Sequence, residues 1–77
     1  VDIDWEFPTS TTDKNNLTAL VQALRTAFSA APNAHPEWLI SGAFSQTTYY
    51  AQYYDLTALT PLLDFYNLMT YDFYGAW

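Results

Sequence analysis

Residues 1–7 (VDIDWEF) alternate between large apolar side chains and carboxylates, and this pattern constrains the fold more than any other in the chain. A period of two predicts a β-strand with one apolar and one polar face. The odd-numbered residues would pack against helices. Asp2, Asp4 and Glu6 would share the other face, spaced about 7 Å apart along the strand. Pro8 is expected to end the strand.

The next segment carries apolar side chains at helical spacing. The members of this stripe are Leu17, Leu20, Val21, Leu24 and Phe28. They predict an amphipathic helix of roughly four to five turns, capped by Thr12 or Asp13 and stopped by Pro32. His35 lies in the following loop and is expected to be exposed. We do not interpret it as a metal ligand, because the chain has no cysteine and no second histidine.

Two further strands are expected, over residues 38–44 (WLISGAF) and 64–73 (DFYNLMTYDF). Between them, residues 45–54 predict a loop that leads to a turn of helix, and Asp55 is expected to cap a short helix over residues 56–63. Strands that alternate with helices imply a parallel sheet with right-handed crossovers. Three parallel strands cannot close a barrel, and an open sheet would leave two bare edges. The chain is therefore expected to be part of a larger α/β domain.

Composition excludes several classes of function. The net charge is −6, and Lys14 and Arg25 are the only basic residues apart from the histidine. A nucleic-acid-binding surface needs a basic patch, and an anionic membrane surface also attracts basic residues. No apolar run is long enough to span a bilayer. We therefore expect no nucleic-acid partner and no membrane insertion.

The three carboxylates of the first strand have three interpretations. They could lie on a solvated face, as most charges do. They could bind a divalent metal, although side chains from one strand line up rather than converge. In a barrel interior, repulsion and desolvation would raise at least one pKa among them, and a carboxylic acid held protonated near neutral pH suits general acid catalysis. The best candidate donor is then Glu6, nearest the strand end where barrel enzymes place their chemistry. The pattern alone leaves the solvated face and the barrel interior equally open.

Two motifs carry a resemblance to a known family. DIDWE, from Asp2 to Glu6, resembles the latter part of the D-G-x-D-x-D-x-E signature of glycoside hydrolase family 18, the chitinase family. MTYDFYGAW, from Met69 to Trp77, resembles the M-x-Y-D segment on the sixth barrel strand of that family, and residues 13–25 are similar to the helix after its acidic strand. The resemblance implies that residues 1–77 are a fragment of a single catalytic domain. That fragment would be a partial TIM (β/α)8 barrel, about strands four to six with the intervening helices.

The same resemblance implies roles for individual residues. Glu6 matches the proton donor to the glycosidic oxygen. Asp4 matches the carboxylate that turns between its neighbour and the substrate acetamide, and Asp2 the inner carboxylate that shares charge with Asp4. Tyr71 matches the tyrosine whose hydroxyl holds the acetamide. The expected substrate-binding residues are Met69, Asp72 and Trp77.

Strand parity gives a partial test of these roles. Phe65, Asn67, Met69 and Tyr71 share one face of the third expected strand, so Met69 and Tyr71 can both point inward. Asp72 has the opposite parity, so the strand must end or bulge before it for the side chain to reach the site. Met69 taken by itself is a residue of ordinary core packing.

The implied activity is that of a retaining chitinase that hydrolyses β-1,4-linked N-acetylglucosamine polymers by substrate-assisted catalysis. The alternatives are a non-catalytic chitin-binding lectin on the same barrel and an endo-β-N-acetylglucosaminidase acting on N-glycans. No cofactor and no metal are implied, and a monomer is expected. Secretion is expected because polymeric chitin cannot enter a cell. The isolated 77 residues are expected to be inactive, because they lack a closed barrel.

Overall fold

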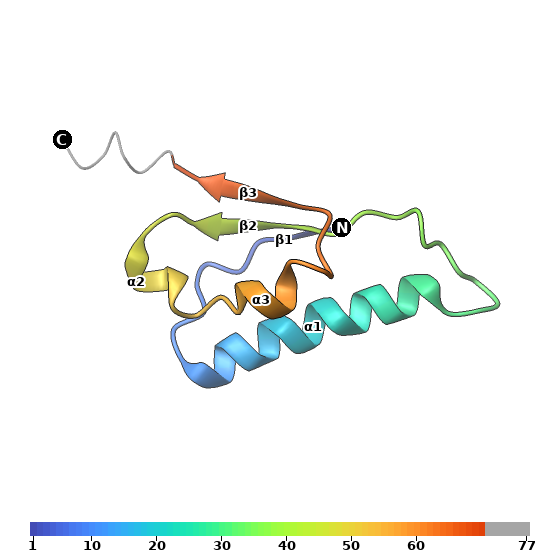
Figure 1. Cartoon of the computed structure of the whole chain (residues 1–77), viewed down its shortest axis with the longest axis horizontal. Coiled ribbons are helices and arrows are strands. Elements are labelled where there is room, and N and C mark those ends of the chain that lie inside the picture. The colour runs from blue at the N-terminus through green and yellow to red at the C-terminus, as the bar shows by residue number, and fades with distance from the viewer. Residues whose placement is uncertain (71–77) are drawn as a thin grey trace.

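The computed structural model describes residues 1–70 of the chain as one parallel sheet covered by helices on one side (Figure 1). The elements in chain order are β1 (Asp2–Ile3), α1 (Thr11–Ser29), β2 (Ser41–Ser45), α2 (Thr48–Ala51), α3 (Leu56–Leu59) and β3 (Phe65–Met69). The strands lie in the order β1-β2-β3, and both neighbouring pairs are parallel. The predicted alternation of parallel strands with helices is confirmed.

The register of the strands separates two faces of the sheet. Asp2 pairs with Ser41, which pairs with Phe65 in β3. Paired residues in a parallel sheet point to the same side, and the side alternates along each strand. Met69 pairs with Ser45 and therefore shares the face of Asp2, as the parity of the sequence predicted. The opposite face carries Phe44, which is buried beneath the helices.

Helix α1 begins earlier than predicted. Its N-cap is Ser10, whose hydroxyl accepts a hydrogen bond from the Asp13 amide at 3.0 Å. Asp13 in turn accepts from the Thr9 amide at 3.0 Å, so the first turn is closed reciprocally. The prediction of Thr12 or Asp13 as the cap was wrong, because the extended residue with a free hydroxyl acceptor lies two positions before Thr12.

One side of α1 enters the core. Leu17 and Val21 are 2% and 1% exposed, whereas Leu20 is 45% exposed. At 3.6 residues per turn, Leu20 lies about 60° around the helix from Leu17, which is enough to leave the contact with the sheet. The prediction that Leu20 belongs to the buried stripe was therefore wrong. The full buried core comprises Leu17, Val21, Ile40, Phe44, Tyr54, Leu59 and Leu63.

The predicted strand and helix bounds were too wide. Strand β1 covers two residues, although exposed and half-buried residues continue to alternate from Asp2 to Phe7. The second strand starts at Ser41 rather than Trp38, which is 49% exposed in the loop before it. Helix α3 stops at Leu59, and β3 covers residues 65–69; the predicted residues 71–73 lie outside the described part. Asp55 caps α3 as predicted, because its carboxylate accepts from the Ala58 amide at 3.1 Å.

The predicted exposed histidine is more closely packed than expected. The ring of His35 stacks on Trp38 with 4.0 Å between centroids, and its Nδ1 lies 2.9 Å from a carboxylate oxygen of Glu37. His35 is half-buried as a result.

Arg25 connects α1 to the amino-terminal ends of two strands. Its guanidinium donates from Nε and Nη2 to the carbonyl of Leu62, at 3.0 and 2.6 Å, and from Nη2 to Asp64 at 2.8 Å. The same Asp64 oxygen accepts from the Ile40 amide at 2.8 Å. Arg25 and the Ile40 amide together hold the pKa of Asp64 below its usual value. Arg25 and its partner Asp64 therefore connect α1 to the residues that directly precede β2 and β3.

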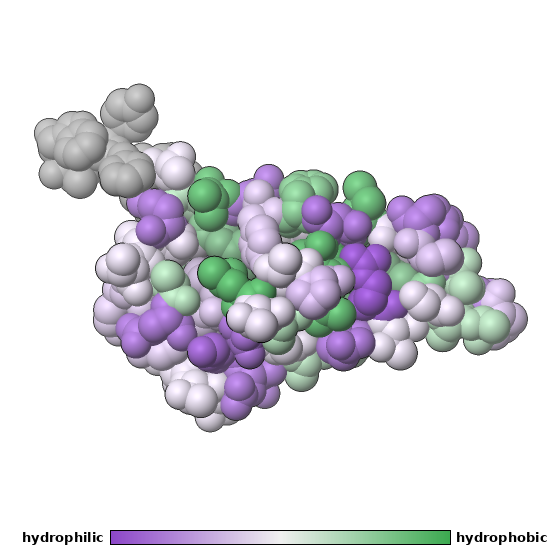
Figure 2. Space-filling model, in the orientation of Figure 1, coloured by the Kyte–Doolittle hydropathy of each residue, from purple (hydrophilic) through white to green (hydrophobic). Residues whose placement is uncertain are grey.

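Much apolar surface remains exposed in the described part. Figure 2 shows apolar side chains reaching the surface among polar ones. They include Leu39, Phe65 and Leu68, which are 55%, 48% and 63% exposed. Within residues 1–70, no helix has the length and apolar character needed to cross a membrane.

Candidate active site

The three carboxylates of the acidic segment are all exposed. Asp2 lies in β1 on the face opposite the helices, since its partner Ser41 pairs in turn with Phe65. Glu6 lies at a bend after β1, and its peptide bond to Phe7 is cis. The acidic segment therefore runs from the paired strand toward the carboxyl-terminal edge of the sheet, and Glu6 is the carboxylate farthest along it.

Ser41 holds the first carboxylate of the segment in place. Its hydroxyl donates to Oδ1 of Asp2 at 2.8 Å, across the β1–β2 pair. Ser41 is 6% exposed, so its hydroxyl is shielded from water, whereas Asp2 is exposed. Sequence analysis did not single out this residue. The available signal was a small hydroxyl residue inside the apolar run WLISGAF, on a strand expected to lie beside the acidic one.

A tyrosine-rich segment lies at the carboxyl-terminal edge of the sheet. The hydroxyl of Tyr54 accepts from the Ser45 amide at 3.1 Å, and burial raises the pKa of Tyr54. Tyr50, on α2, stacks on Phe7 with 4.2 Å between ring centroids and 20° between planes. The segment after β2 therefore contacts the residue that directly follows Glu6.

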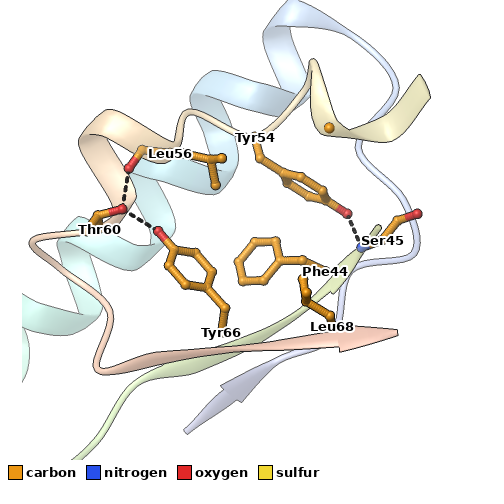
Figure 3. A pocket seen from close by; sticks show the side chains of 8 residues that line it. Phe44, Ser45, Tyr54, Leu56, Thr60, Tyr66 and Leu68 are labelled. Carbon is orange, nitrogen blue, oxygen red and sulfur yellow. Dashed lines mark hydrogen bonds between the residues drawn. The ribbon is translucent and has the colours of Figure 1, made fainter. Parts of the chain in front are cut away.

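A cavity in the described part lies away from the acidic segment. Its volume is about 340 Å³, and Figure 3 shows its lining side chains between the sheet and α3. The lining residues are Phe44, Ser45, Ala51, Tyr54, Leu56, Thr60, Tyr66 and Leu68. Phe44, Tyr66 and Leu68 belong to the helix-covered face, which is opposite to the face of Asp2. The cavity is therefore part of the packing layer, and the carboxylates do not open into it.

The structure brings some of the predicted site residues onto one face. Met69 lies on the face of Asp2, with β2 between their strands. Tyr71, Asp72 and Trp77 lie outside the described residues. Among residues 1–70, no group of three or more acidic or histidine side chains is arranged to hold a metal ion.

Comparison with known proteins identifies the family. The profile of Glycosyl hydrolases family 18 matches residues 1–77. The chain belongs to this family. It is 38% identical to a class V chitinase of Arabidopsis thaliana, over 97% of the chain and 21% of that protein. It is 41% identical to a probable endochitinase of Caenorhabditis elegans, over 100% of the chain and 13% of that protein.

Solved structures of family 18 proteins have the same arrangement. Catalytic domain 2 of the Group II chitinase of Ostrinia furnacalis matches 94% of the chain with a TM-score of 0.77 and 34% identity, over 20% of that structure. A chitinase-like agglutinin of Robinia pseudoacacia matches 92% of the chain with a TM-score of 0.65 and 35% identity, over 22% of that structure. These matches show a fold of the TIM-barrel type. The present chain spans about a fifth or less of the length of the two curated relatives named above.

Proposed function

We propose that residues 1–77 form about strands four to six of a family 18 catalytic barrel, and that the whole protein is a retaining chitinase. The observation that carries this proposal is the acidic segment. Asp2, Asp4 and Glu6 are exposed in order along a segment that starts on the helix-free face and runs to the carboxyl-terminal edge of a parallel sheet. In a barrel, that face is the interior and that edge is where the chemistry takes place.

The surface of the described part supports a larger domain. Phe65 lies on the helix-free face and is 48% exposed, which would be unfavourable in water but suits the interior of a closed barrel. On the other face, the apolar cavity beside β3 leaves room for another helix to pack against the sheet. Both features fit a chain whose remaining strands and helices cover it.

Each carboxylate would have a separate role in the reaction. Glu6 would protonate the glycosidic oxygen and then act as a base toward water. Asp4 would orient the substrate acetamide and stabilise the positive charge that develops on its nitrogen. Asp2, held by Ser41, would share charge with Asp4. The acetamide oxygen would attack the anomeric carbon, so no second nucleophilic carboxylate is needed, and the configuration is retained.

The remaining proposed site residues would position the sugar. Tyr71 would hold the acetamide against the reacting carbon, a proximity effect. Met69, on the face of Asp2, would lie under the reacting sugar. Asp72 and Trp77 would bind neighbouring sugar groups. The substrate would be chitin or its oligomers. We propose that the protein is secreted, because polymeric chitin lies outside cells, and that it acts as a monomer.

A chitin-binding lectin is the second candidate. The match to a chitinase-like agglutinin favours it, since that protein aligns over almost the same part of the chain. The candidates differ in what they require of Glu6. Catalysis needs its proton, whereas binding does not.

The test compares the full-length protein with its Glu6→Gln variant on a fluorogenic chitobioside. Glutamine keeps the shape of the side chain and cannot give up a proton, so the rate should fall by about two orders of magnitude or more. Glu37→Gln is the matched control, because it neutralises an exposed carboxylate in the loop before β2, and it should retain the wild-type rate. A wild type that binds chitin oligomers without hydrolysing them would establish the lectin instead.

A further inference from the structure

The residues after Glu6 are more buried than Glu6 itself. Pro8 is among the fully buried side chains, whereas Glu6 is exposed. Between them, Phe7 is half-buried and stacks on Tyr50 in a nearly parallel arrangement, 4.2 Å apart. The proposed acid therefore joins a chain segment that is held by packing on its carboxyl-terminal side.

The partner of Phe7 comes from a short segment fastened to β2 at both ends. Before α2, the Thr47 amide donates to the Ser45 hydroxyl at 3.2 Å. After α2, the Ser45 amide donates to the buried Tyr54 hydroxyl at 3.1 Å. Because both contacts meet at Ser45, the turn of helix that carries Tyr50 is closed on the last residue of β2.

Figure 1 shows α2 just beyond the carboxyl-terminal end of β2, on the same side of the molecule as the chain leaving β1. Tyr50 also packs against the hydrophobic core, and the edge of the Tyr49 ring meets it at 4.9 Å. The ring of Tyr50 therefore has neighbours on several sides. It connects the anchored segment after β2 to the peptide that follows Glu6.

We propose that Tyr50 is a positioning residue for Glu6, acting through its stack on Phe7. The inference rests on the proposed function, in which Glu6 gives its proton to the leaving group. A stack on the adjacent side chain limits how far the backbone of Glu6 can shift. A displacement of about 1 Å in a catalytic group can cost on the order of 100-fold in rate.

A positioning role differs in its kinetics from simple packing. If Tyr50 only packs, its loss lowers stability and leaves the turnover of folded protein unchanged. If it positions the acid, its loss lowers kcat/KM, which reports the step that releases the leaving group, most for substrates whose leaving group needs a proton. A dinitrophenyl leaving group departs without a proton, whereas a sugar hydroxyl does not. The ratio of the two losses therefore reports on the acid itself.

The test uses the full-length protein with three variants. Tyr50→Ala removes the stack, and Tyr50→Phe keeps the ring. Phe28→Ala removes a half-buried ring in the last turn of α1, which contacts Trp38, before β2, in a T-shaped arrangement at 5.3 Å. Each is assayed on a chitooligosaccharide and on a dinitrophenyl chitobioside, with the melting temperature measured beside the rates. Tyr50→Leu fills the space without a flat ring and replaces Tyr50→Ala if that variant does not fold.

We expect Tyr50→Ala to lower kcat/KM on the oligosaccharide by about 10- to 100-fold and on the activated substrate by less than about 5-fold. Tyr50→Phe should match the wild type, and Phe28→Ala should lose stability alone. Equal losses of kcat/KM on both substrates, or an unchanged kcat/KM, would overturn the positioning role while leaving the chitinase proposal intact. An inert wild type would overturn both.

Discussion

The two edges of this small sheet are built differently. At the amino-terminal edge, Arg25 contacts Leu62 and Asp64, and Asp64 contacts Ile40, so charged and main-chain groups satisfy one another. At the carboxyl-terminal edge, the acidic segment ends in the exposed carboxylate of Glu6. There the contacts that hold the chain are aromatic stacking and single hydrogen bonds to hydroxyl groups, such as that between Ser45 and Tyr54.

Under the proposed function, this difference separates stability from chemistry within residues 1–70. A guanidinium that satisfies backbone carbonyls stabilises the packing of α1 on the sheet but leaves no charge for a substrate. Exposed carboxylates contribute little to folding, and under the proposed function those of the acidic segment act on the substrate. Parallel strands have their amino-terminal ends at one edge and their carboxyl-terminal ends at the other, and barrel enzymes use the first for stability and the second for catalysis. The predictions below test whether the two edges are independent.

The largest effect is expected at the amino-terminal edge. Arg25→Ala removes both hydrogen bonds to the Leu62 carbonyl and the ion pair with Asp64. Hydrogen bonds to charged groups contribute about 1.5–3 kcal/mol, so the free energy of unfolding should fall by about 2–3 kcal/mol. The measurement is urea unfolding of the full-length protein. The kcat of the folded variant should equal that of the wild type.

Lys14→Ala is the matched control, because it removes a positive charge from the other end of α1. We expect it to change the unfolding free energy by less than about 0.5 kcal/mol. The two edges would not be independent if Arg25→Ala lowered the kcat of folded protein without lowering the free energy of unfolding. Arg25 would then act on the proposed site.

Local patterns in the sequence predicted the structural features that depend on residues close together in the chain. The period of two over Asp2 to Phe7 predicted the alternation of exposed and half-buried side chains, because it depends on neighbours in the chain. The alternation of strands and helices predicted the parallel sheet. Parity along the third strand allowed Met69 to point to the side of Asp2, and the register of the strands places it there.

Contacts between distant residues were not predictable in the same way. Arg25 and Asp64 are 39 positions apart, as are Ser41 and Asp2, and both pairs depend on the register of the strands. The extent of β1 also depends on its neighbours. Beyond Ile3 the chain bends, and the Ser45 amide donates to Tyr54 instead of to a strand. No periodicity in the sequence carries this information.

An intermediate effect is expected at Ser41, the first residue of β2, which contacts the acidic segment. Ser41→Ala removes the hydroxyl that donates to Asp2 at 2.8 Å. If Asp2 acts with Asp4 in the reaction, a less constrained carboxylate should lower kcat by about 3- to 10-fold, with a loss of stability of about 1 kcal/mol. Ser41→Thr retains the hydroxyl and should recover most of the rate. A loss of stability with unchanged kcat would assign Ser41 to the structural edge.

The smallest effect is a dependence of stability on pH. Arg25 lowers the pKa of Asp64, so the stabilisation from this pair is fully present above the usual carboxyl pKa of about 4. It is lost as the pH falls through the lowered pKa, where Asp64 takes up its proton. The free energy of unfolding should therefore decrease below about pH 4, and the decrease should be shallower in Asp64→Asn.

Glu37→Gln serves as the comparison for this titration. Hydrogen bonding to His35 also lowers the pKa of Glu37, but this pair lies on a surface loop before β2. The contact between His35 and Glu37 is exposed and joins residues only two positions apart, so the unfolded chain can keep much of their interaction. We therefore expect Glu37→Gln to flatten the acid dependence of unfolding less than Asp64→Asn does. If the two variants changed it equally, Asp64 would act as an ordinary surface carboxylate. The amino-terminal edge would then owe its stability to the contacts of Arg25 with main-chain carbonyls alone.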